Sequence, residues 1–196
     1  MTTAPVPADP VPNFSWWACE PRRLLRDCAE IAARFPDLVW KAEGAGTWEG
    51  RLPRWPFDRP EPEHLTSWIG DEGLQLRVEH SQAYPMVAPR LVPLDPLPEP
   101  FEWTQTRWHV SGDASLCLLR EDAVWTGREA IVDLLLKAAG WRVEYALMKR
   151  QVIEQMTDNG IVDDDRFDHF LIRPPTPEDT TGESDLMRTE PDGPAC

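Results

Sequence analysis

Apolar residues recur at helical spacing in two parts of the chain. From Pro21 to Phe35 they stand three and four residues apart, which predicts one amphipathic helix that Pro36 helps to end. A second helical region is predicted from about Gly127, with Gly140 as a bend or boundary. The apolar positions are Leu24, Leu25, Cys28, Ile31, Ala32 and Phe35 in the first helix, and Ile131, Leu134, Leu135, Ala138, Val143 and Leu147 in the second.

Between these helices, short β-prone segments are separated by Gly, Pro and charged turns, which predicts an antiparallel meander. The segments are residues 38–44, 47–55, 74–80 and 90–94. The third is the clearest strand, because Leu74, Leu76 and Val78 alternate with polar residues and predict one wet face. Residues 81–100 hold six prolines, which excludes a helix or a central strand and predicts a surface path with an edge strand at Arg90–Leu94.

Composition divides the chain into one domain and two tails. A chain of 196 residues is long enough for one globular core, while its 21 prolines predict many loops. Residues 1–13 are rich in proline and have little to bury, so we expect a flexible arm. Residues 174–196 hold six acidic residues, one basic residue and five prolines, which predicts a disordered acidic tail. The domain is then expected at residues 14–173.

The net charge narrows the class of partners. A formal charge of -14 at pH 7 makes nucleic acid and anionic membranes unfavourable as primary partners. No apolar run approaches the roughly 20 residues that span a bilayer, and the N-terminus lacks the layout of a signal peptide. We therefore expect a cytoplasmic protein that binds neither nucleic acid nor membrane.

The four cysteines are Cys19, Cys28, Cys117 and Cys196, and they are widely scattered. Because no Cys-x-x-Cys pair occurs, neither a zinc ribbon nor a disulfide framework is predicted, and reduced thiols are expected. The four histidines are equally dispersed, so no metal site and no cofactor are predicted. Cys28 lies within an apolar helical stripe, which favours a buried small hydrophobe.

Cys117 stands between two leucines after a polar turn, and is either a small apolar residue of a strand or a thiol displayed for chemistry. Its surroundings resemble those of the ubiquitin-conjugating enzymes. In that family a Tyr-Pro turn, here Tyr84-Pro85, follows a strand; a His-Pro-Asn motif precedes a Gly-x-x-Cys-Leu segment; and a Trp follows the cysteine. The matching residues here are His109, Cys117 within "SLCLL", and Trp125.

More narrowly, "HVSGDASLCLL", "EDAVW" and "LLLKAAGW" are similar to the conjugating-enzyme-like proteins of bacterial antiphage operons that signal through cyclic oligonucleotides. The similarity spans roughly residues 20–155. It implies an α+β, ubiquitin-conjugating-enzyme-like fold with an N-terminal helix, an antiparallel β-meander, a catalytic-cysteine loop and C-terminal helices. It further implies that Cys117 forms a thioester with the C-terminus of a protein partner, a cyclic-oligonucleotide synthase, with or without an activating enzyme. A thiol suits this role because it is both a strong nucleophile as thiolate and a good leaving group.

Two departures from the family qualify this expectation. Val110 and Ser111 replace the family's Pro and Asn, and Cys117 follows His109 by eight positions, about two fewer than usual in eukaryotic members. Because the Asn supports aminolysis of the thioester, its replacement weakens the case for lysine ligation but not for thioester formation. The alternative is a catalytically inactive binding module that scaffolds a partner.

The neighbours of Cys117 also allow two interpretations each. His109 either braces the loop, which is favoured, or transfers a proton. Ser111 and Asp113 either replace part of the missing Asn or simply form the turn. Trp125 is expected to pack under the cysteine loop as a structural residue.

Overall fold

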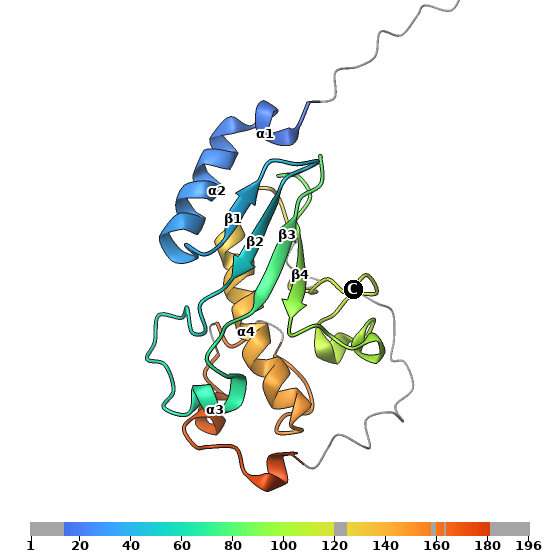
Figure 1. The fold of residues 1–196 in the computed structure, drawn as a ribbon. Coiled ribbons are helices and arrows are strands. Elements are labelled where there is room, and N and C mark those ends of the chain that lie inside the picture. The colour runs from blue at the N-terminus through green and yellow to red at the C-terminus, as the bar shows by residue number, and fades with distance from the viewer. Residues whose placement is uncertain (1–13, 120–124, 158–159, 163, 181–196) are drawn as a thin grey trace, which may run out of the picture.

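The structure is a computed structural model and describes residues 14–119, 125–157, 160–162 and 164–180 (Figure 1). It combines helices with one antiparallel sheet, so the predicted α+β class is confirmed. The α-helices are α1 (Trp16–Cys19), α2 (Pro21–Arg34), α3 (Leu65–Ile69), α4 (Ile131–Lys149) and α5 (Asp168–Leu171). Three 3-10 helices accompany them: η1 (Pro100–Glu102), η2 (Thr106–Trp108) and η3 (Pro177–Thr180).

The sheet is a four-stranded meander in which each strand pairs antiparallel with the next along the chain. Its strands are β1 (Val39–Lys41), β2 (Thr47–Arg51), β3 (Gln75–Glu79) and β4 (Arg90–Asp95). The predicted meander is confirmed, and so is the position of β4 at an edge of the sheet. In β3 the side chains of Leu76 and Val78 are buried while their polar neighbours are half-buried, as the alternation predicts.

Helix α2 has the predicted extent and buries part of the predicted stripe, Ile31 and Phe35, together with two charged residues. Arg23, Asp27 and Ile31 are its buried residues, whereas Leu25, in the predicted stripe, is 69% exposed. The physical reason is that Arg23 and Asp27 form an ion pair of 2.9 Å and are satisfied by partners from other segments. The buried face therefore includes charged residues beside the apolar stripe, and the expectation of burial is wrong only for Leu25 and Ala32.

Helix α4 is the long helix of the core, and Figure 1 shows it crossing behind the sheet. The six apolar residues predicted for it are buried, in one cluster with residues of the sheet. Gly140 is not a boundary of the helix, which runs unbroken through that residue. A Cβ atom at Gly140 would lie 3.3 Å from Cγ1 of Ile161, so this glycine makes room for the segment that packs on α4.

The predicted arm, residues 1–13, and residues 181–196 of the predicted tail lie outside the described residues. The first part of that tail carries η3, where Asp179 forms an ion pair of 2.9 Å with Arg173. Among the described residues, no helix is both long enough and apolar enough to span a membrane.

Candidate functional site

Cys117 ends a short hairpin that begins at His109. The Cys117 N–H donates to the carbonyl of His109 at 2.9 Å, and Val110 forms an antiparallel bridge with Leu116. The N–H of Leu116 also donates to the carbonyl of Leu91 in β4, at 2.8 Å. The hairpin is thus attached to the edge strand of the sheet, which fixes the backbone on which Cys117 stands.

The turn of this hairpin is built by Asp113. One of its carboxylate oxygens accepts hydrogen bonds from the Ser115 N–H at 3.0 Å and from the Ser115 hydroxyl at 2.6 Å. The other oxygen pairs with Arg90 of β4 at 2.7 Å. The Ser115 hydrogen bond, with a smaller contribution from Arg90, lowers the pKa of Asp113. These contacts agree with the simpler of the two interpretations, in which Asp113 forms the turn.

His109 lies directly against the backbone of Cys117. Its Nδ1 is 3.1 Å from the carbonyl oxygen of Cys117, so in the tautomer that carries hydrogen on Nδ1 the ring donates to that carbonyl. His109 has a left-handed backbone conformation, with φ of 50°, at the point where η2 ends. The two residues singled out from the sequence are therefore brought together, and the contact is of the bracing kind.

The sulfur of Cys117 is not a free thiol in the structure, because Cys117 is disulfide-bonded. Cys19 and Cys28 are free, so the partner of Cys117 is neither of the other two described cysteines. The expectation that every cysteine is a reduced thiol is thus wrong for Cys117. The count and spacing of cysteines did not signal this bond, because a disulfide depends on tertiary proximity. Any chemistry of the thiol requires prior reduction.

Cys117 is half-buried between two hollows of different character. The first is a cavity of about 20 Å³, which is room for about one water molecule, and its walls include His109, Lys137 and Glu144. The second is an apolar hollow of about 190 Å³ on the side of β4. Its walls are mostly aliphatic: Pro89, Leu91, Leu116, Leu118, Leu119 and Leu134.

Two polar side chains of α4 hold the backbone around this site. Lys137 Nζ donates to the carbonyl of Leu118, the residue after Cys117, at 3.2 Å. One helical turn later, Trp141 Nε1 donates to the carbonyl of Trp108, the residue before His109, at 2.8 Å. Both ends of the hairpin are therefore fixed to the same face of α4.

Glu144 continues this face and is a buried carboxyl group, 1% exposed. It accepts hydrogen bonds from the Thr157 hydroxyl at 2.6 Å and from the Thr157 N–H at 3.2 Å. Burial nevertheless raises the pKa of Glu144 to about 7. Neither Lys137 nor Glu144 was predicted from the sequence as part of the site. The available signal was the occurrence of charged residues, spaced for one helical face, within an otherwise apolar helix.

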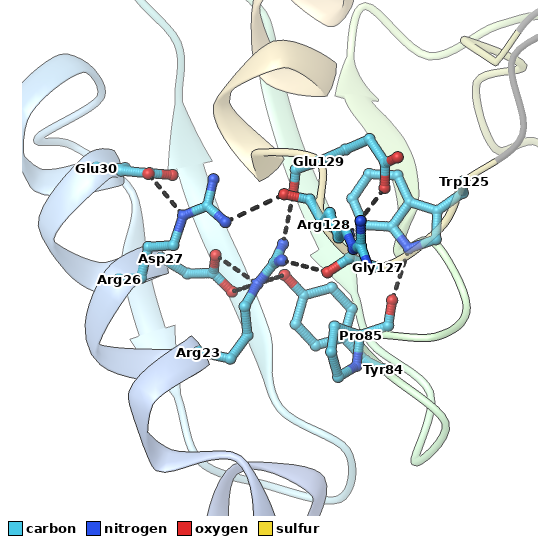
Figure 2. A network of polar contacts seen from close by, with 10 residues as sticks. All are labelled: Arg23, Arg26, Asp27, Glu30, Tyr84, Pro85, Trp125, Gly127, Arg128 and Glu129. Atoms are coloured by element: carbon cyan, nitrogen blue, oxygen red, sulfur yellow. Dashed lines mark hydrogen bonds and ion pairs between the residues drawn. The ribbon is translucent and has the colours of Figure 1, made fainter.

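A buried polar network fixes the segment that leads from the site into α4 (Figure 2). Arg23 Nη1 donates to the carbonyl of Gly127 at 2.7 Å, and Nη2 donates to that of Glu129 at 2.8 Å. The Nε of the same guanidinium donates to the Tyr84 hydroxyl at 2.9 Å, which in turn donates to Asp27 at 2.6 Å. Helix α2, the turn after β3 and the residues before α4 are thereby joined.

Trp125 belongs to the same segment. Its Nε1 donates to the carbonyl of Pro85 at 2.7 Å, and its ring lies 6.5 Å from that of Tyr84 (Figure 2). These contacts are those of a packing residue. The contacts agree with a structural role for Trp125, but they are made with the Tyr84-Pro85 turn rather than with the cysteine loop under which Trp125 was expected.

Among the described residues, no group of three or more His, Cys, Asp or Glu side chains is arranged to hold a metal ion. No protein-family model, curated protein or solved structure matches the chain.

Proposed function

We propose that this protein is a ubiquitin-conjugating-enzyme-like acyl carrier in which reduced Cys117 forms a thioester with the C-terminus of a protein partner. The observation that carries the proposal is the hairpin of residues 109–117, in which His109 braces the carbonyl of Cys117 beside an edge strand. The order of helix, four-stranded meander, cysteine loop and long helix further agrees with the family that the motifs resemble. By that resemblance, the partner is a cyclic-oligonucleotide synthase of a bacterial antiphage system.

The chemistry requires two steps. A cellular dithiol first reduces the disulfide of Cys117 by thiol–disulfide exchange. The dithiol is oxidised to a disulfide, and Cys117 is released as a thiol. The Cys117 thiolate then attacks the carbonyl of an activated acyl group, for which the natural donor is a thioester on an activating enzyme. The donor's thiolate leaves and takes the proton lost by Cys117, so that one thioester replaces another.

Intact-mass analysis of this chain, co-expressed with a cyclic-oligonucleotide synthase and an activating enzyme of the same host, tests the proposal. We expect a covalent adduct that is broken by thiol reductant. Cys117→Ala should form no adduct, and Cys117→Ser should give, if acylated, an ester that resists reductant but not hydroxylamine. Cys28→Ser is the matched control and should retain the adduct, because Cys28 is a free thiol on α2.

The second candidate is a binding module without chemistry, and the disulfide of Cys117 is the observation that favours it. Purely noncovalent association under reducing conditions, or an adduct that persists in Cys117→Ala, would support this candidate over the acyl carrier.

A further inference from the structure

Lys137 places a cation beside Cys117. Its Nζ donates to the carbonyl of Leu118, the next residue in the chain, at 3.2 Å. Lys137 also lines the same cavity of about 20 Å³ as Cys117. It stands near the middle of α4, between the buried residues Leu136 and Ala138, so the helix that carries it is held firmly.

Within the part of the chain that the structure describes, the charge of Lys137 is not used in an ion pair. No carboxylate of the described residues lies within ion-pair distance of its Nζ, although Asp133 is one turn earlier on α4. Lys149, at the end of the same helix, differs in this respect, because its Nζ pairs with Glu99 and, at 3.2 Å, with Glu102. A half-buried ammonium group that has no anionic partner among the described residues can stabilise a negative charge that develops next to it.

We propose that Lys137 stabilises the thiolate of reduced Cys117, as a positioning residue for the thioester chemistry proposed above, on which this inference rests. A nearby cation favours the charged form of a thiol and so increases the fraction of the nucleophilic thiolate. The hydrogen bond from Lys137 to the carbonyl of Leu118 also keeps the ammonium group next to the loop during the reaction.

Two other titratable groups face the cavity, His109 and Glu144. Asp164 and Arg166 act on Glu144 from the following segment, with opposite effects on its charge. Because burial raises the pKa of Glu144 to about 7, its carboxylate charge appears as the pH rises through neutrality. That negative charge opposes a thiolate, so removing it should have the opposite effect to removing Lys137.

The rate at which iodoacetamide alkylates Cys117 tests the inference without any partner protein. The full chain is reduced with a phosphine, alkylated for short times between pH 6 and 9.5, digested, and followed at the Cys117 peptide by mass spectrometry. The exposed thiol of Cys19 is the internal reference. We expect Lys137→Met to raise the apparent pKa of Cys117 by about one unit, which slows alkylation at pH 7 about tenfold but leaves the alkaline plateau unchanged.

Three further variants distinguish an electrostatic from a structural effect. Lys137→Arg keeps the charge and should retain the wild-type profile, and Lys149→Met removes a cation of α4 that is already paired and should also retain it. Glu144→Gln should shift the profile above pH 7 in the opposite direction, towards faster alkylation. An unchanged profile in Lys137→Met, or an equal loss in Lys137→Arg, would overturn the inference.

This outcome is independent of the acyl adduct. If the alkylation profile shifts but no adduct forms, the acyl-carrier function is refuted and the stabilisation of the thiolate by Lys137 is supported. If an adduct forms but the profile does not shift, the acyl-carrier function is supported and the stabilisation of the thiolate by Lys137 is refuted.

Discussion

The contribution of His80 to the stability of this protein should fall as the pH drops below about 6.5, because His80 is buried in its neutral form. The ring of His80 is 8% exposed and is enclosed by the rings of Tyr84, Trp16 and Trp40, whose centroids lie 4.5, 5.3 and 5.6 Å away. Its Nδ1 is 3.1 Å from the carbonyl of Gly46 and donates to it in the neutral tautomer. Within the described part of the chain, Nε2 is buried with no hydrogen-bond partner.

A proton on Nε2 would therefore place an N–H group in an aromatic cluster that offers no acceptor. The pKa of His80 is lowered from 6.5 to about 4, mainly by burial. The hydrogen bond to Gly46 raises this pKa, and the positive charge of Arg23 lowers it further. Between these two values the unfolded chain binds a proton that the folded protein does not, so stability is lost as the pH falls. At about 1.4 kcal/mol for each pH unit, the loss attributable to His80 between pH 7.5 and about pH 5.2 is about 2 kcal/mol.

Urea unfolding of the wild type and of His80→Phe over this pH range is the appropriate assay. The range stops above the isoelectric point of about 4.6, where the protein would tend to associate. Phe keeps a ring in the aromatic cluster and does not titrate. The carbonyl of Gly46 keeps a hydrogen bond in the variant, because it also accepts from the backbone N–H of residue 80 at 3.2 Å. The difference in unfolding free energy should move by about 2 kcal/mol in favour of the variant as the pH falls. If the unfolding free energies of the wild type and the variant changed in parallel with pH, His80 would not be buried in its neutral form.

Two further predictions concern packing. Arg23→Met should lower the free energy of unfolding, measured by heat or urea, by about 3–5 kcal/mol, because it leaves Asp27 buried without its cation. The double variant Arg23→Met/Asp27→Leu should recover part of that loss. If its loss equalled the sum of the losses of the two single variants, the buried pair would be contradicted. Gly46→Ala should destabilise the protein by ~1–3 kcal/mol more than Gly44→Ala. Both glycines have positive φ, but only at Gly46 would a Cβ atom clash with a ring, because it would lie 2.1 Å from Cη2 of Trp40. Equal losses of stability in urea unfolding would refute this prediction.

The two long helices and the strands follow from local pattern, whereas the short helices α1, α3 and α5 were not predicted. Alternation along β3, proline in β4 and helical spacing in α2 and α4 each report on side chains only a few residues apart, and the structure has these elements where they were predicted. The sequence also contained the motif that singled out His109 and Cys117, because the two residues lie in one short hairpin.

Tertiary structure alone decided which polar groups are buried and what surrounds Cys117. Arg23 and Asp27 look like surface residues of an amphipathic helix, and they become interior residues because carbonyls and a hydroxyl more than 50 positions away satisfy them. Lys137 stands on a helix 20 positions beyond Cys117. It bonds the carbonyl of Leu118 and lines the same cavity as Cys117 only because the hairpin lies on that helix. Short-range periodicity carries no information about such contacts, since their energy depends on distance in space and on burial, which only the folded chain defines.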